Sequence, residues 1–243
     1  MKINLIESFC NQYVGFVRVV AEDGSFGWGQ LSTYNADITQ QILHRQVAPW
    51  VLGREVSTQE MLDDTLDLVT EKEHKFPGSY LRRAMAGVDT AIWDLHGRQQ
   101  DKPVAALLGG SAGKVRAYAS SMKRDITPQD EAKRMCALRD KYGFDAFKVR
   151  AGAEVGRNQD EWPGRTEEII PTMRRAMGDE ASLLIDANSC YTPERAIEVG
   201  LLLQDHGFSH FEEPCPYWEL EQTKLVTDYL DIDVTGGEQD CDL

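Results

Sequence analysis

The first 33 residues show the alternation of apolar and polar side chains that is typical of β-strands. The segment YVGFVRVVAEDGSFGWGQ contains two β-rich runs on either side of Asp23-Gly24. An Asp-Gly pair between two such runs is a strong hairpin signal, because it suits the backbone of a two-residue turn. The sequence therefore predicts a β-hairpin within an N-terminal group of strands.

Between residues 38 and 98 the spacing of apolar residues becomes helical. Ser57 is followed three residues later by Glu60, a capping-box pattern, and the run MLDDTLDLV comes next. The spacing then predicts a second helix, with one apolar face formed by Met85, Val88, Ile92 and Leu95. A boundary is indicated by the small residues of LLGGS at 107–111.

After this boundary, strand-like runs and helical segments take turns along the chain. Thr127-Pro128 and Thr192-Pro193 each have the residue types of an N-cap and first helical position, and helix ends are indicated by Gly143 and Gly207. Further helices are expected near 165–177 and 218–230. The candidate strands lie in VRAYAS, FDAFKVR, SLLIDAN, SHFEEP and DIDVTGGE. An alternating β/α order predicts parallel strands covered by helices.

The pattern predicts an α+β capping domain over residues 1–112, followed by a partial (β/α) TIM-type barrel domain over 113–243. A closed barrel of this type needs eight strands and about 200–250 residues, and about five strands are expected here. We expect a fragment, a truncated gene product, or a sheet that another chain completes. An open sheet leaves two unpaired edges, so self-association is also expected.

The charge and composition of the chain indicate which kinds of binding partner are expected. The formal net charge is −14, and the sequence has no Lys/Arg-rich run, which argues against binding to nucleic acid or to an anionic membrane. No segment reaches the roughly 18 consecutive apolar residues of a membrane span, and the N-terminus does not resemble a signal peptide. The five cysteines are odd in number and form no CxxC pair, which favours free thiols and a cytoplasmic location.

Three acidic residues follow apolar runs at equal spacing: Asp186, Glu212 and Glu238, with steps of 26 residues each (212 − 186 and 238 − 212). One strand, one helix and two turns take about this length, so parallel strands would bring the three carboxylates to one end of a sheet. Converging carboxylates repel each other unless a cation joins them. An all-oxygen set suits Mg²⁺ better than Zn²⁺.

Four patches of the sequence resemble the mandelate racemase/muconate lactonizing enzyme group of the enolase superfamily. They are AGVDTAIWDLHGRQQDKPVAALLGG at 86–110, FKVR at 147–150, LLIDANSCYT at 183–192, and FEEP with GGEQ at 211–214 and 236–239. The resemblance implies a cap domain over a modified barrel, with Mg²⁺ held by Asp186, Glu212 and Glu238. It also implies removal of a proton from the carbon next to a carboxylate, which a divalent cation assists by stabilising the developing charge.

Lys148 and Arg150 occupy the family's Lys-x-Lys motif, and the resemblance makes them the catalytic candidates. Residues two apart on a strand point to the same side, so both side chains can face the barrel axis. Arginine stays charged at any usual pH, so Arg150 is suited to bind a carboxylate and unsuited to act as a base. This departure argues against a racemase with two lysine bases and favours the family's His–Asp base on later strands, which this sequence lacks.

Three further residues are candidates for substrate binding: Asn188, Glu213 and Trp28. Asn188 could instead be a turn former, Glu213 could support the site without touching substrate, and Trp28 could belong to the sheet core. The expected substrate is a small carboxylate, a sugar acid, and we expect a homo-oligomer.

Mg²⁺-dependent dehydration of an aldonate or aldarate to a 2-keto-3-deoxy acid is the expected reaction. A racemase or epimerase of a 2-hydroxy acid, or a catalytically inert truncated relative, is the alternative.

Overall fold

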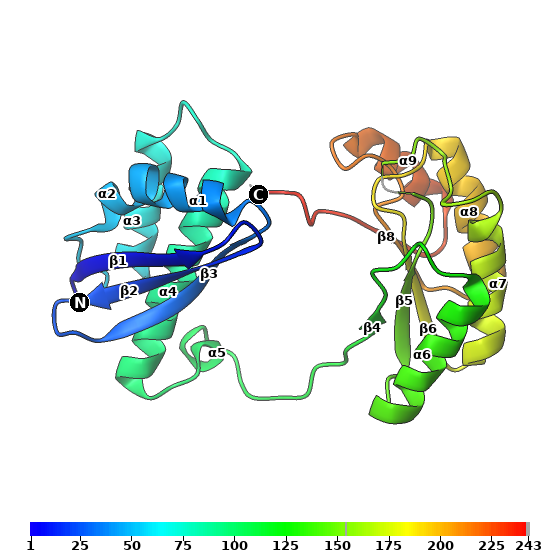
Figure 1. The fold of residues 1–243 in the computed structure, drawn as a ribbon, viewed down its shortest axis with the longest axis horizontal. Coiled ribbons are helices and arrows are strands. Elements are labelled where there is room, and N and C mark those ends of the chain that lie inside the picture. The colour runs from blue at the N-terminus through cyan, green and yellow to red at the C-terminus, as the bar shows by residue number, and fades with distance from the viewer. Residues whose placement is uncertain (154, 242–243) are drawn as a thin grey trace. The chain divides into compact units, whose positions relative to one another are not determined.

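The structure is a computed structural model, and it describes residues 1–153 and 155–241. It divides into two compact units, Met1–Lys114 and Val115–Asp240, each of which has its own hydrophobic core (Figure 1). In the part of the chain that the structure describes, no helix is both long enough and apolar enough to cross a membrane.

The first unit begins with an antiparallel sheet in the order β1-β2-β3. Its strands are Ile3–Cys10, Val14–Ala21 and Phe26–Thr33. The predicted hairpin joins β2 to β3: Gly24 has a φ of 82°, and the backbone N–H of Ser25 donates to Asp23 Oδ1 at 2.9 Å. The Asp-Gly signal therefore located this turn correctly.

Helices follow the sheet, and the longest of them, α4 (Ser79–Gln100), runs along one face of it (Figure 1). Met85, Val88, Ile92 and Leu95 are all buried on α4, so the predicted apolar face is confirmed. The other helical segments of this unit are α1 (Ala36–Ile42), the π-helical η1 (Leu43–Val47), α2 (Ala48–Val51), α3 (Gln59–Lys72) and α5 (Val104–Leu107).

The start of α3 corrects the expected capping box. The N-cap is Thr58, not Ser57, and its side chain accepts a hydrogen bond from the backbone N–H of Met61 at 3.2 Å. Ser57 Oγ instead accepts from the N-terminal amine of Met1. The cap is therefore the hydroxyl residue next to the predicted one, and Ser57 is engaged with a residue 56 positions away in sequence.

The second unit contains a parallel five-stranded sheet in the order β4-β5-β6-β7-β8. The strands are Ala119–Ser120, Ala146–Arg150, Ser182–Asp186, His210–Glu212 and Asp233–Thr235, and the helices after the first four are α6 (Pro128–Tyr142), α7 (Arg165–Met177), α8 (Pro193–Asp205) and α9 (Leu220–Tyr229). The predicted fold class, a capping α+β unit followed by a partial β/α barrel, is confirmed. VRAYAS was overestimated as a strand, since only its last two residues pair with β5.

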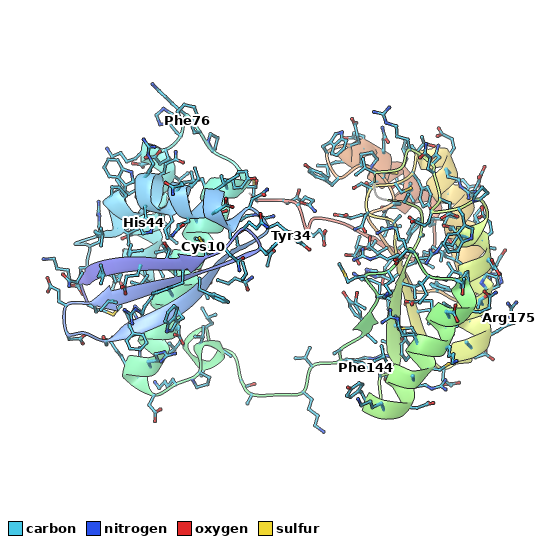
Figure 2. The ribbon with its side chains drawn as sticks, in the orientation of Figure 1. Cys10, Tyr34, His44, Phe76, Phe144 and Arg175 are labelled. Carbon is cyan, nitrogen blue, oxygen red and sulfur yellow. The ribbon has the colours of Figure 1, made fainter. Side chains whose placement is uncertain are left out.

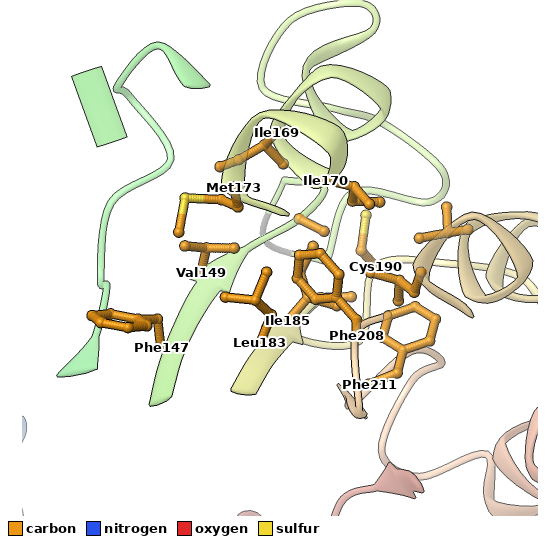
Figure 3. Packing of buried hydrophobic residues seen from close by; sticks show 14 of the residues in the cluster. Phe147, Val149, Ile169, Ile170, Met173, Leu183, Ile185, Cys190, Phe208 and Phe211 are labelled. Carbon is orange, nitrogen blue, oxygen red and sulfur yellow. The ribbon is translucent and has the colours of Figure 1, made fainter. Parts of the chain in front are cut away.

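The core of this unit lies between the sheet and its helices. Figure 3 shows Ile169, Ile170 and Met173 of α7 pointing toward Val149 and Ile185 on the strands. All five are 0–1% exposed. The packing of α7 against the strands holds the carboxyl ends of β5 and β6 in place. Arg150 and Asp186 are the last residues of these two strands.

All five cysteines are free thiols, as expected. Cys190 and Cys215 are buried in the second unit, and burial raises the pKa of the Cys215 thiol to about 12. Cys10 lies on β1 of the first unit (Figure 2), where its Sγ donates to Gln40 Oε1 at 2.9 Å. Neither arrangement resembles an activated, nucleophilic thiolate.

We predict that Gly27→Ala destabilises the first unit. A Cβ at this position would lie 2.1 Å from Ala91 O and 2.4 Å from Leu95 N, so β3 and α4 would have to separate. Such overpacking costs about 1–3 kcal/mol in free energy of unfolding, measurable by urea titration. The matched control is Gly113→Ala, whose Cβ would meet no atom within 4 Å. Equal stability of the two variants would contradict this account of the close helix–sheet contact.

Candidate active site

Charged residues gather at the carboxyl ends of three neighbouring strands in the second unit. The register pairs Arg150 on β5 with Asp186 on β6, and pairs Asp186 with Glu212 on β7. Since parallel strands end at a common edge of the sheet, these three residues form one row. Lys148 lies two residues before Arg150 on the same strand.

Each of the two acids in this row contacts a cation from β5. Arg150 Nη1 donates to Asp186 Oδ2, and Lys148 Nζ donates to Glu212 Oε2 and lies 3.9 Å from Asp186 Oδ2. Lys148, Arg150 and Asp186 are 6%, 7% and 1% exposed. Charges buried to this degree are stable only when oppositely charged groups compensate them.

The protonation of the site follows from burial and from these contacts. Burial raises the pKa of Asp186, and this effect outweighs the opposing Arg150 guanidinium. Burial would lower the pKa of Lys148, but the hydrogen bond to Glu212 and its negative charge raise the pKa above the ordinary value. Lys148 therefore stays protonated at neutral pH.

Asn188 connects the cations and the anions of the site. Its Oδ1 accepts from Arg150 Nη1 at 2.6 Å and from Arg124 Nη2 at 2.5 Å, and its backbone N–H donates to Asp186 Oδ1 at 2.8 Å. The residue has a φ of 42°, a left-handed conformation that is uncommon outside glycine. The left-handed backbone of Asn188 agrees with the turn-forming interpretation, and its role in substrate binding stays a prediction.

Glu213 is also held in the left-handed region, with a φ of 42°. It is 4% exposed, and its Oε1 has no hydrogen-bond partner. Burial raises the pKa of its carboxyl group, and the charges of Glu238 and Asp186 raise it further. A buried carboxylate oxygen without a partner indicates that a donor or cation belongs beside it.

Two of the predicted site residues lie outside the register row, although the charge of Glu238 acts on Glu213. Glu238 is exposed and follows the last residue of β8, Thr235, by three positions, so it is not in the register row. Trp28 belongs to β3 in the first unit, where its ring centroid is 5.4 Å from that of Phe9. The structure brings together Lys148, Arg150, Asp186, Glu212, Asn188 and Glu213.

Sequence reasoning missed Arg124 and Tyr118. Arg124 comes shortly after β4, and it donates to Gly152 O at 3.0 Å as well as to Asn188. Tyr118 precedes β4, and the Lys148 ammonium lies 5.1 Å from its ring centroid. The rule that located the acids, a polar residue at a strand end, also applies to Arg124.

The residues present fit Mg²⁺ in their chemistry. Asp186 and Glu212 offer carboxylate oxygens from adjacent strands, and Glu213 has a buried oxygen without a partner. Within residues 1–153 and 155–241, however, no three His, Cys, Asp or Glu side chains are placed to hold a metal ion. Lys148 contacts Glu212 Oε2 and Arg150 contacts Asp186 Oδ2. A metal ion bound at these two oxygens would displace the two cations.

Two parts of the chain match models of known protein families. Residues 4–109 match the mandelate racemase/muconate lactonizing enzyme N-terminal domain, and residues 130–243 match the enolase C-terminal domain-like family. The chain belongs to the mandelate racemase/muconate lactonizing enzyme group of the enolase superfamily. The family assignment made from the four sequence patches is confirmed.

Among members of this group, arabinonate dehydratase from Saccharolobus solfataricus is 30% identical over 234 residues, which is 91% of this chain and 57% of the relative. A crystal structure of a candidate racemase from Roseobacter denitrificans is 76% identical, with a TM-score of 0.97 over 100% of this chain and 66% of that one. A group member from Paracoccus denitrificans, complexed with magnesium, is 29% identical with a TM-score of 0.89 over 98% of this chain and 65% of that one.

The curated relatives of this group are dehydratases, cycloisomerases and epimerases, so the family is enzymatic. The chain spans somewhat more than half the length of the curated relatives it matches.

We predict that Arg150→Met destabilises the second unit. Without the guanidinium, the buried Asp186 carboxylate loses its ion-pair partner, and removal of one partner of a buried pair costs about 3–5 kcal/mol. Hydrogen exchange of peptides from Val115–Asp240 measures the loss. The double variant Arg150→Met/Asp186→Asn is expected to recover part of it, because it leaves no unpaired charge. Strictly additive losses would contradict a direct coupling between the two residues.

Proposed function

We propose that the chain takes part in removing the proton from the carbon next to a carboxylate, in the Mg²⁺-dependent dehydration of a sugar acid to a 2-keto-3-deoxy acid. The observation that carries the proposal is the row of Asp186 and Glu212 at the carboxyl ends of adjacent strands, each beside a cation from β5. The arabinonate dehydratase relative supports the substrate class, and the magnesium complex of the Paracoccus protein supports the metal.

Asp186 and Glu212 would hold the metal ion, with Glu238 as the third ligand. When bound, Mg²⁺ supplies Lewis-acid stabilisation of the negative charge that develops on the substrate carboxylate. Lys148, which lies beside Glu212 and Asp186, would add a donor to the same carboxylate. Arg150 and Asn188 lie together at the strand ends and would bind the substrate's oxygen atoms. Glu213 and Trp28 remain proposed substrate contacts.

Arg150 does not serve as the proton acceptor, because a guanidinium stays protonated at any usual pH. A racemase of the two-lysine type needs a base at position 148 and at position 150. Arginine at position 150 therefore favours dehydration, in which Lys148 would bind and polarise the substrate.

Racemisation is the second candidate, because the protein from Roseobacter denitrificans, 76% identical to this chain, is described as a candidate racemase. The two reactions differ in whether a hydroxyl group leaves. Dehydration of galactonate, galactarate or arabinonate in D₂O would yield a 2-keto-3-deoxy acid, detected with semicarbazide, and absence of turnover would favour the inert truncated relative. Incorporation of deuterium without keto acid would replace dehydration by racemisation. The control is Lys148→Met, which we expect to lower either rate at least about 100-fold.

Metal binding can be tested without turnover. We expect Mg²⁺ at 100 times its Kd to raise the free energy of unfolding of the wild type by about 2.7 kcal/mol. Glu212→Gln should lose this shift, whereas Glu219→Gln, an acid outside the register row, should keep it. A Mg²⁺ shift that Glu212→Gln retains would contradict the proposed metal centre. Loss of the shift together with loss of sugar-acid turnover would link the two parts of the proposal.

A further inference from the structure

One edge of the buried Arg150 guanidinium meets a weak hydrogen-bond acceptor. Its Nε donates to the carbonyl oxygen of Ser121 at 3.0 Å, and its Nη1 donates to Asp186 and Asn188. Its Nη2 instead donates to the sulfur of Met122 at 3.1 Å. A thioether is a much weaker acceptor than a carbonyl or carboxylate oxygen. The Nη2 edge is therefore the part of this group to which a stronger acceptor could still bind.

Arg124 brings a second guanidinium to the same place. Arg124 Nη2 and Arg150 Nη1 donate to one oxygen atom, Asn188 Oδ1, at 2.5 and 2.6 Å. Two guanidinium groups that share an amide oxygen repel each other, since the amide carries no net charge. An anion bound to both groups would replace this repulsion by two attractions. The planar fork of N–H donors on arginine matches the two oxygens of a carboxylate.

A cavity of about 280 Å³ lies beside these groups, and it is lined by Met122, Arg124, Asp125 and Glu161. The first three residues belong to the loop between β4 and α6, and Glu161 belongs to the loop between β5 and α7. Met122 is 77% exposed, so its side chain can move away from Arg150 without loss of a packed core contact. A ligand in this cavity would reach the Nη2 edge of Arg150 by displacing the thioether.

We propose that Met122, Arg124 and Arg150 form a subsite for a second carboxylate, which makes the substrate a dicarboxylic sugar acid, an aldarate. This inference rests on the proposed function, in which the first carboxylate of the sugar acid binds beside Asp186 and Glu212. The second carboxylate takes the place of the Met122 sulfur at Arg150 Nη2 and also accepts from Arg124. An aldonate has no anion for this subsite.

The acidic residues of the cavity favour a carboxylate over a phosphate. Guanidinium groups form bidentate pairs with both, so a phosphorylated sugar acid would also offer a second anion. Asp125 and Glu161 line the same cavity. They repel a phosphate monoester, with its charge of about −1.5 to −2, more strongly than a carboxylate with a single charge. Their oxygens can also accept hydrogen bonds from the hydroxyl groups that neighbour the carboxylate of an aldarate.

The test compares pairs of sugar acids that differ only at C6. Galactarate and glucarate have a carboxylate there, whereas galactonate and gluconate have a hydroxymethyl group. We expect the wild-type chain with Mg²⁺ to bind at least one aldarate at least about tenfold more tightly than its matched aldonate, measured by calorimetry. Arg124→Gln should remove this preference. Arg175→Gln, which changes an exposed arginine on α7, should keep it (Figure 2).

Met122→Glu probes the subsite by filling it with a carboxylate of the chain itself. Because Met122 is exposed, the substitution should not lower the free energy of unfolding. The glutamate would pair with the Nη2 edge of Arg150, so we expect the preference for the aldarate to fall at least about tenfold. Met61→Glu, at an exposed methionine on α3, is the matched control and should leave the preference unchanged.

Binding and turnover separate this subsite from the proposed function. Preferred binding of an aldarate without formation of keto acid would support the subsite and contradict the dehydration. Equal binding of aldarates and aldonates, or a preference that survives both Arg124→Gln and Met122→Glu, would overturn the subsite even if dehydration occurs. Tighter binding of 6-phosphogluconate than of glucarate would overturn the assignment to a carboxylate. If none of these acids binds, the subsite is overturned, and the stabilisation by Mg²⁺ still tests the metal centre separately.

Discussion

The second unit depends on the neutralisation of charges that the parallel register forces together. Because β5, β6 and β7 end at one edge, Arg150, Asp186 and Glu212 must share a row, and the core beneath them excludes water. Two carboxylates there would repel each other, and two cations from a single strand compensate them. Removing Asp186 leaves the buried Arg150 guanidinium without an ion-pair partner, and removing Arg150 leaves Asp186 with only the more distant Lys148, so these charges depend on one another.

The same arrangement sets a condition on metal binding. A divalent cation between Asp186 and Glu212 would compete with Lys148 and Arg150 for their oxygens. The two cations would then be released toward the substrate side, where a carboxylate can bind them. Metal and anionic substrate should therefore favour each other's binding. The metal would displace Lys148 and Arg150 from the two acids, and the substrate carboxylate would give these cations a new partner. Glu213 Oε1, buried and without a hydrogen-bond partner, is a further oxygen that a donor or cation could satisfy.

Local signals in the sequence were sufficient for most elements, since a helix such as α6 is defined by Thr127 at its N-cap, Pro128 next to it and Gly143 at its end. The family patches likewise identified Asp186 and Glu212 at adjacent strand ends. What local patterns could not supply were contacts between distant segments. The choice of Thr58 over Ser57 as a cap and the two-guanidinium contact on Asn188 both depend on residues far away in sequence.

The hairpin shows a further limit of the same kind. Alternation in β2 and β3 separates two faces, but it cannot say which face meets α4, because Val17 and Phe16 are both apolar. The glycines decide it: Gly27 and Gly29 approach the backbone of α4 too closely for any side chain, so their face must be the inner one. Phe26 and Trp28 then have to point outward with Phe16 and Arg18. Close packing on one side of the sheet thus determines which positions of β3 face away from α4, and the side-chain types at those positions make that surface aromatic.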